Sequence, residues 1–291
     1  MHMQIEDIQK KIADDAKAEA LAKSEEVEKI SKQLAKYLSP QIHEQIFSGK
    51  QSAEVKSNRK KLTVFFSDIV GFTDISDELE SEEMTNLLNF YLNEMSQIAL
   101  RFGGTIDKFI GDALMIFFGD PDTNGPQEDA RKCIQMALEM QKLMNQLSGY
   151  WSKNYSLKQD LKIRIGINTG FCTVGNFGSL DRLDYTAIGS TVNLASRLES
   201  IAEAGSIIIS EDTFALVNNF FTFKKPKNVK IKGFLRDIKC YELKKEDTSK
   251  EDMFSLSGKG FQIDINKKII KKDALDEIKN KLSLIMDGET G

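Results

Sequence analysis

Cysteine and histidine are both scarce in this sequence. Three cysteines and two histidines occur among 291 residues, and one of the histidines is the second residue. An odd number of widely spaced cysteines argues against a disulfide framework or a zinc site and is typical of a reducing compartment, so we expect a cytoplasmic location. The other histidine, His43, leaves no Ser-His or Cys-His pair for nucleophilic catalysis. The cysteines are Cys133, Cys172 and Cys240.

Long apolar runs, a strong net charge and a P-loop are absent as well. No stretch of about 18 consecutive residues is apolar, and the start has no signal-peptide pattern, so we expect no membrane segment. A net charge of -4 gives no field that would attract nucleic acid. The missing G-x-x-x-x-G-K-[ST] pattern excludes a P-loop NTPase. Met1-His2-Met3 looks like a cloning remnant, from which we expect an upstream sensor domain outside this chain.

Residues 4–47 contain no glycine and are rich in helix-favouring residues. Val27, Ile30, Leu34 and Tyr37 keep the 3-4-3 spacing of a coiled-coil seam. We therefore expect a helix that dimerises in parallel, the alternative being an amphipathic helix packed on its own domain. The sequence divides into residues 1–50, a helical dimerisation or transducer segment, residues 51–245, the main domain, and residues 246–291, an extension of unknown role.

Two short apolar segments each deliver a carboxylate. The run 62–66 is rich in β-branched and aromatic residues, which predicts a buried strand, and Asp68 follows at its end. Gly111-Asp112 separates two strand-like runs at the spacing of a two-residue hairpin. Carboxylates at the tips of neighbouring strands, beside a turn with free backbone N–H groups, suit hard cations that carry a polyphosphate.

The order of the predicted elements is β-α-β-β-α-β. This order predicts an α+β fold with a ferredoxin-like core, in which an antiparallel sheet carries helices on one face and further strands and helices follow. Residues 49–61 are polar and basic, which predicts a linker, and the tail is expected to hold a strand-like segment over 253–265 and a helix over 274–286. The core elements are expected at 62–66, 81–102, 105–118, 127–147 and 161–170, followed by a hairpin over 171–186, a helix over 189–203 and a strand over 206–210.

Four motifs in a fixed order resemble the catalytic domain of class III nucleotide cyclases, the adenylate and guanylate cyclase family. The resemblance covers residues from about 61 to 243, about two thirds of the chain. The motifs are Phe66-Ser-Asp68-Ile-Val-Gly-Phe-Thr73, Asp107-Lys108-Phe-Ile-Gly111-Asp112-Ala, Ile163-Arg164-Ile-Gly166-Ile-Asn-Thr-Gly170, and Tyr185-Thr186-Ala-Ile-Gly189-Ser-Thr-Val-Asn193-Leu-Ala-Ser-Arg197-Leu-Glu199.

The resemblance implies that Asp68, Asp112 and Ile69 bind two Mg²⁺ or Mn²⁺ ions. These ions would activate the ribose 3′-hydroxyl and neutralise the triphosphate, so that the 3′-oxygen displaces pyrophosphate from the α-phosphorus and a 3′,5′-cyclic nucleotide forms. Arg164 would add positive charge near the β- and γ-phosphates. The backbone N–H groups that would cradle these phosphates belong to Ile69, Val70, Gly71, Phe72 and Thr73.

The same resemblance places Lys108 and Thr186 at the two positions that select the base. An ammonium can donate to N1 of adenine, whereas N1 of guanine carries a proton, and a threonine hydroxyl can accept from the adenine 6-amino group. The implied substrate is therefore ATP. Asn193 and Arg197, four residues apart on one helix face, would hold the ribose and stabilise charge at the α-phosphate. Lys232 would meet the triphosphate, with Lys230 as the alternative.

In this family each active site forms between two chains, and this chain carries both sets of residues. The resemblance therefore implies a homodimer with two complete sites, a role that fits the expected helical dimer. Two alternatives remain open: a guanylate cyclase, and a catalytically silent nucleotide-binding module. A diguanylate cyclase shares the core fold, but Phe102-Gly-Gly-Thr-Ile lacks the acidic Gly-Gly-Asp-Glu-Phe signature of that family.

Overall fold

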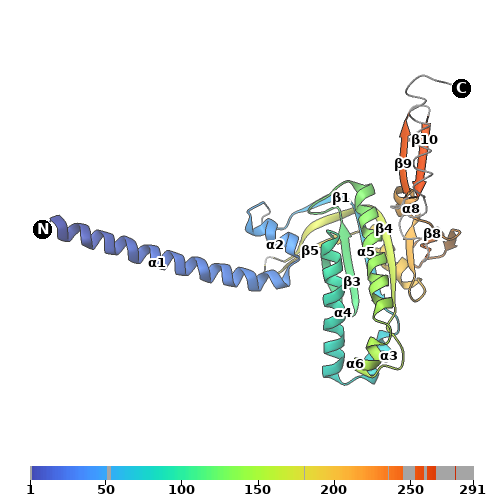
Figure 1. Ribbon diagram of the computed structural model, residues 1–291, viewed down its shortest axis with the longest axis horizontal. Coiled ribbons are helices and arrows are strands. Elements are labelled where there is room, and N and C mark those ends of the chain that lie inside the picture. The colour runs from blue at the N-terminus through green and yellow to red at the C-terminus, as the bar shows by residue number, and fades with distance from the viewer. Residues whose placement is uncertain are drawn as a thin grey trace.

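The computed structural model describes residues 2–50, 54–179, 181–234, 236–244, 253–258, 261–266 and 279. Its central element is a sheet of eight strands with helices packed on it (Figure 1). The strands are β1 (Ser57–Ile69), β2 (Thr105–Ile110), β3 (Ala113–Phe118), β4 (Ile163–Gly178), β5 (Leu183–Ile188), β6 (Ile207–Ser210), β7 (Lys227–Val229) and β8 (Ile238–Glu242). They follow the order β2-β3-β1-β4-β6-β8-β7, and β5 pairs with β4.

The helices of the main body connect and cover these strands. The first group follows β1 and comprises α3 (Phe72–Glu78) and α4 (Ser81–Arg101). The remainder are α5 (Pro126–Gln146), α6 (Tyr150–Tyr155), α7 (Ser190–Ser200) and α8 (Glu211–Val217). The order β1-α4-β2-β3-α5-β4 is the predicted ferredoxin-like core, so the α+β fold expected from the sequence is confirmed.

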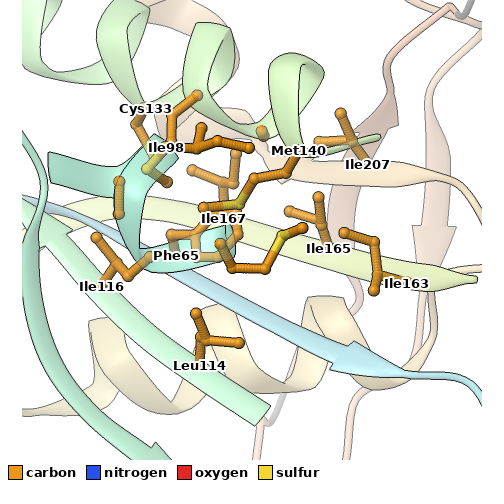
Figure 2. Packing of buried hydrophobic residues seen from close by; sticks show 14 of the residues in the cluster. Phe65, Ile98, Leu114, Ile116, Cys133, Met140, Ile163, Ile165, Ile167 and Ile207 are labelled. Atoms are coloured by element: carbon orange, nitrogen blue, oxygen red, sulfur yellow. The ribbon is translucent and has the colours of Figure 1, made fainter. Parts of the chain in front are cut away.

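Helices α4 and α5 bury one face of the sheet. Figure 2 shows Cys133 and Met140 of α5 beside Ile163, Ile165 and Ile167 of β4. Alternate residues of a strand point to the same face, which is why every second residue of this part of β4 is apolar and buried here. This cluster is the main hydrophobic core, and it fixes the end of β4 that carries Arg164.

Helix α7 covers the opposite face. Its Val192 and Ala195 pack in one cluster with Val64 of β1. A Cβ atom at Gly166 would lie 2.1 Å from the backbone nitrogen of Glu199 and 2.4 Å from the carbonyl oxygen of Ala195. Glycine is therefore required for this close approach of α7 to β4. The approach places the polar residues of α7 beside the ends of β1 and β4.

A long helix, α1 (His2–Leu34), leads away from the main body (Figure 1). A single 3₁₀ turn and α2 (Pro40–Phe47) follow it. The four side chains of the predicted seam are exposed, from 49% for Ile30 to 87% for Tyr37. The expected N-terminal helix is confirmed, and its seam does not pack on the main body, so the coiled-coil dimer stays a prediction. No helix among the described residues is long and apolar enough to cross a membrane.

One expectation from the sequence is wrong. Residues 57–61 are not a linker, because their backbone groups pair with β4 and extend β1 beyond the core. The core sheet of β1 to β4 is antiparallel and carries α4 and α5 on one face, as expected. Beyond this core, the crossover through α7 returns the chain parallel to β4 as β6, and α7 covers the other face.

The tail is described in part. Strands β9 (Met253–Gly258) and β10 (Phe261–Asn266) form an antiparallel hairpin where a strand-like segment was expected. The helix predicted over 274–286 lies outside the described residues, apart from Lys279. The short helices α6 and α8 were not predicted. In α8 the Ser210 hydroxyl accepts from the backbone N–H of Thr213, which is a helix-capping signal present in the sequence.

Candidate active site

A guanidinium lies between two carboxylates where β1 and β4 meet α7. Asp68 and Arg164 are direct partners in the β1–β4 ladder, and Arg164 Nη2 donates to Asp68 Oδ2 at 2.8 Å. Arg164 Nε is ion-paired with Glu199 Oε1 of α7 at 2.7 Å. The register of the ladder brings Asp68 and Arg164 together, and the tight packing of α7 on β4 brings in Glu199.

Asp112 joins this group through the backbone. It lies in the turn between β2 and β3, and its Oδ2 accepts from the backbone N–H of Ile69 at 2.9 Å. Burial raises the pKa of the Asp112 carboxyl, and the neighbouring negative charge of Asp68 adds to this effect. Burial and Asp68 also raise the pKa of Glu199 to about 7, while Arg164 acts in the opposite direction. Negative charge is therefore in excess here.

A divalent cation fits this charge distribution. Mg²⁺ is commonly bound through one or two carboxylates and completes its coordination with water and substrate phosphates. Asp68 and Asp112 supply two such carboxylates, and a cation would relieve the repulsion between them. No group of three or more His, Cys, Asp or Glu side chains in the described part of the chain forms a complete metal cage. Water or phosphate oxygens would therefore complete the coordination of a cation held by Asp68 and Asp112.

Two of the five backbone N–H groups that were predicted to bind phosphate already have hydrogen-bond partners within the chain. Ile69 donates to Asp112, and Val70 donates to the carbonyl oxygen of Lys162 at 2.9 Å. Gly71 has φ 72°, in the left-handed region that favours glycine, and turns the chain into α3. Phe72 and Thr73 open that helix, so with Gly71 they present N–H groups that the helix itself does not use.

A second group forms around the buried carboxylate of Asp107. The Thr186 hydroxyl donates to Asp107 Oδ1 at 2.9 Å and lies 2.7 Å from Oδ2. The backbone N–H of Ala187 donates to Oδ2 at 3.1 Å, and Lys108 Nζ is 3.3 Å from Oδ1. Burial raises the pKa of the Asp107 carboxyl, and the three donors act in the opposite direction. Strand β5 thus returns to β2 and brings the two predicted base-selecting side chains to one carboxylate.

The remaining predicted residues are exposed and apart from the first group. Asn193 and Arg197 share one face of α7, as their four-residue spacing predicts, and both are exposed. Lys230 and Lys232 are both exposed, so exposure does not distinguish them. Among the described residues, no hydrogen bond or ion pair joins these side chains, or those around Asp107, to Asp68, Asp112 or Arg164.

Exposed apolar side chains adjoin the second group. Phe109 and Ile110 follow Lys108 at the tip of the β2–β3 hairpin and are 47% and 53% exposed. Ile188, two residues after Thr186, is 47% exposed. These three side chains lie within two residues of Lys108 or Thr186 in the chain and are accessible to a partner protein.

Two residues of these groups received no role from the sequence. Asp107 and Glu199 both lie inside the motifs quoted above. The signal at Asp107 was a carboxylate next to a predicted base-selecting lysine. At Glu199 the signal was an acid at the end of an apolar helix face, two residues after Arg197. The sequence does not show that Asp107 contacts Thr186 or that Glu199 contacts Arg164, because the members of these pairs lie 79 and 35 residues apart in the chain.

Comparison with known proteins identifies the family. Residues 54–245 match the model of the adenylate and guanylate cyclase catalytic domain. The chain belongs to this family, whose members include both adenylate and guanylate cyclases. The family named from the four sequence motifs is therefore confirmed.

Curated relatives include both kinds of cyclase. An adenylate cyclase of Anabaena cylindrica is 33% identical over 193 residues, which cover 65% of this chain and 38% of that protein. The receptor-type guanylate cyclase gcy-13 of Caenorhabditis elegans is 34% identical over 198 residues, which cover 68% of this chain and 18% of that protein. The chain thus spans well under half of the length of these relatives.

The similar solved structures also include both adenylyl and guanylyl cyclases. The adenylyl cyclase CyaB from P. aeruginosa is 53% identical, with a TM-score of 0.63, and the match covers 65% of this chain and 96% of that one. The guanylyl cyclase Cya2 is 34% identical, with a TM-score of 0.61, and the match covers 64% of this chain and 93% of that one.

Mn²⁺ should stabilise the parent protein more than a variant that lacks one of the two carboxylates. At about 100 times its dissociation constant, a ligand specific for the folded state adds about 2.7 kcal/mol. Differential scanning fluorimetry with and without Mn²⁺ should show a rise in Tm for the parent. Most of this rise should be lost in Asp68→Asn and in Asp112→Asn, because each removes one negative ligand.

Asp74→Asn is the matched control, since Asp74 is an exposed acid of the neighbouring helix α3. Its Mn²⁺-dependent rise should equal that of the parent. Equal rises in all four proteins would contradict a metal site at Asp68 and Asp112.

Proposed function

We propose that this chain is an adenylate cyclase that converts ATP to 3′,5′-cyclic AMP and pyrophosphate. The observation that supports ATP most directly is the meeting of Lys108 and Thr186 at the Asp107 carboxylate. Adenine presents an acceptor at N1 and a donor at its 6-amino group, whereas guanine presents a donor at N1 and an acceptor at O6. An ammonium that donates and a hydroxyl oxygen that accepts match the edge of adenine.

The phosphate end of ATP would lie at the end of β1. Asp68 and Asp112, with the carbonyl of Ile69, would hold two Mg²⁺ or Mn²⁺ ions, which when bound lower the pKa of the ribose 3′-hydroxyl and neutralise phosphate charge. Arg164 is already held beside Asp68 and would contact the phosphates. The N–H groups of the loop would donate to the β- and γ-phosphates. Of the five in this loop, those of Gly71, Phe72 and Thr73 are left for this role, because Ile69 and Val70 donate within the chain.

The reaction itself needs no protein nucleophile. The ribose 3′-oxygen loses its proton and attacks the α-phosphorus in line, the bond from phosphorus to the bridging oxygen breaks, and pyrophosphate leaves with the electron pair. Asn193 would orient the ribose, and Arg197 would donate to the charge that develops at the α-phosphate. Lys232 would bind the triphosphate from the same side as these two. Their exposure on α7 leaves both helix residues free to reach a substrate held by another chain.

Each active site would be completed by a second copy of the chain. One chain would supply Asp68, Asp112 and Arg164, and its partner would supply the base-selecting and ribose-binding residues. The support is that no described contact joins the two groups within one chain, and that Phe109, Ile110 and Ile188 are exposed beside the second group. A symmetric dimer would bury these apolar side chains and create two equal sites.

The N-terminal helix would carry the signal. The exposed seam of α1 suits a parallel coiled coil between the two chains, with an upstream sensor domain at its far end. Helix α2 follows after a single 3₁₀ turn, and its Gln41 Nε2 donates to the carbonyl oxygen of Gly104, immediately before β2. A rotation of the two helices would therefore reach the β2–β3 hairpin, which carries both Lys108 and Asp112.

A guanylate cyclase is the second candidate, because guanylate cyclases match this chain at similar identity to the adenylate cyclase from Anabaena. Product formation from purified chain with Mn²⁺ and either ATP or GTP distinguishes the two. We expect cyclic AMP from ATP, and a kcat/KM at least about tenfold lower for GTP, since a mismatched hydrogen bond costs about 1 to 3 kcal/mol. Chromatography resolves the cyclic products. Cyclic GMP as the main product would support the second candidate, and a folded dimer that makes neither product would support a silent module.

Two inactive variants should restore activity to each other when mixed. Asp68→Ala removes a metal ligand and Arg197→Ala removes a ribose–phosphate contact, so each alone should lose nearly all cyclase activity. After random exchange, half of the dimers hold one copy of each variant, and one of their two sites is intact. We expect about a quarter of the parent activity.

A mixture of Asp68→Ala with Asp112→Ala is the matched control. Both changes fall on the same side of the shared site, so no dimer of this mixture has an intact site. Activity in the control mixture, or none in the first mixture despite proven subunit exchange, would contradict the shared site.

A further inference from the structure

Asp107 is the one carboxylate that contacts both predicted base-selecting side chains among the described residues. Its side chain is 0% exposed, although it lies beside the 40% exposed side chain of Lys108. Both of its oxygens lie within hydrogen-bond distance of the Thr186 hydroxyl. A buried carboxylate is costly unless it is paired, so its position here requires these partners.

The direction of the hydrogen bond to Thr186 follows from the chemistry of the two groups. A threonine hydroxyl has one proton and two lone pairs, and can donate or accept. An ionised carboxylate can only accept, so the Thr186 proton is directed at Asp107. The lone pairs of Thr186 Oγ1 then face away from Asp107. A hydroxyl without this partner could rotate and offer either its proton or its lone pairs to a base.

We propose that Asp107 is a positioning residue that determines base specificity by holding the Thr186 hydroxyl as an obligate acceptor. This inference rests on the proposed function, in which Thr186 meets the 6-position of the purine. The 6-amino group of adenine donates to such an acceptor. The O6 of guanine is itself an acceptor and would face the Thr186 lone pairs with no proton between them.

Lys108 belongs to the same arrangement. Its ammonium is 3.3 Å from Asp107 Oδ1, so one negative charge restrains both side chains. The backbone N–H of Ala187 also donates to Oδ2, which fixes the carboxylate against β5 and leaves it little freedom to turn. Asp107 would act on the choice of base only through Thr186, because its own side chain is covered and the Lys108 ammonium remains a donor with or without it.

Asp107→Asn tests the proposal with the smallest change in shape. The asparagine carbonyl can accept from the Ala187 N–H in place of Oδ2, and the amide NH₂ then stands in place of Oδ1, 2.9 Å from Thr186 Oγ1. The Thr186 hydroxyl is then no longer an obligate acceptor towards the base, because it can accept from this amide and offer its own proton to guanine O6. The preference for adenine over guanine should fall by about tenfold, the value of one hydrogen bond of about 1.4 kcal/mol.

Binding of 3′-deoxyATP and 3′-deoxyGTP in the presence of Mn²⁺ measures this preference without turnover. Neither nucleotide has the 3′-hydroxyl that the reaction consumes, so isothermal titration calorimetry gives the ratio of the two dissociation constants for each variant. Asp184→Asn is the matched control, because Asp184 is an exposed acid two residues before Thr186 on β5. Its ratio should equal that of the parent.

A Thr186→Val background shows whether Asp107 acts through the hydroxyl. There the substitution Asp107→Asn should change the ratio by less than about twofold, because the group on which it acts is gone. Chemical unfolding first checks that each variant folds. If Asp107→Asn does not fold, Asp107→Ser replaces it, since serine also removes the obligate acceptor.

The outcomes separate this proposal from the cyclase assignment. An unchanged ratio in Asp107→Asn, an equal change in the Thr186→Val background, or a parent without preference for 3′-deoxyATP would each overturn the role of Asp107. Failure of the parent to make a cyclic nucleotide would overturn the cyclase assignment instead, and the binding ratios would still report on Asp107.

Discussion

The ladder between β1 and β4 is the constraint on which the rest of the site depends. All 13 residues of β1 pair with β4, from Ser57 opposite Gly175 to Ile69 opposite Ile163. This register sets Asp68 directly against Arg164, and the far end of β4 also pairs with β5. A slip by one residue would turn every side chain of β1 to the other face, so the two buried clusters fix the register. The first group of candidate site residues follows from the pairing of β4 with β1, and the second depends on the pairing of the same strand with β5.

Much of the fold follows from patterns within short windows of sequence. The apolar periodicity of α4 and α5 and the turn at Gly111-Asp112 are local signals, and their elements were predicted within a few residues. The parallel pairing of β4 with β6 has no local signal, because it depends on how α7 crosses the sheet. The start of β1 was missed for a related reason, since its exposed residues are polar and only the pairing with β4 makes them a strand.

The candidate site, like the fold, has a part that local sequence signals predict and a part that depends on long-range contacts. Its predicted metal-binding and base-selecting residues were named because each lies in a motif of contiguous residues. Asp107 was quoted within a motif and given no role, since its partner Thr186 lies 79 residues away and the contact depends on the return of β5 to β2. The pairing of Arg164 with Glu199 likewise requires the close approach of α7 at Gly166. Long-range pairs of polar groups are set by tertiary packing, which the sequence does not display.

The β2–β3 hairpin links the two halves of this account. Lys108 and Asp112 lie on it four residues apart, one held at Asp107 and the other held at the end of β1. In the proposed dimer these two residues serve different active sites, so one chain alone would have no complete site. Specific activity measured on serial dilution, with the monomer fraction followed by mass photometry, tests this most directly. Activity per chain should fall in proportion to the dimer fraction, whereas full activity per chain in a solution of monomers would contradict the shared site.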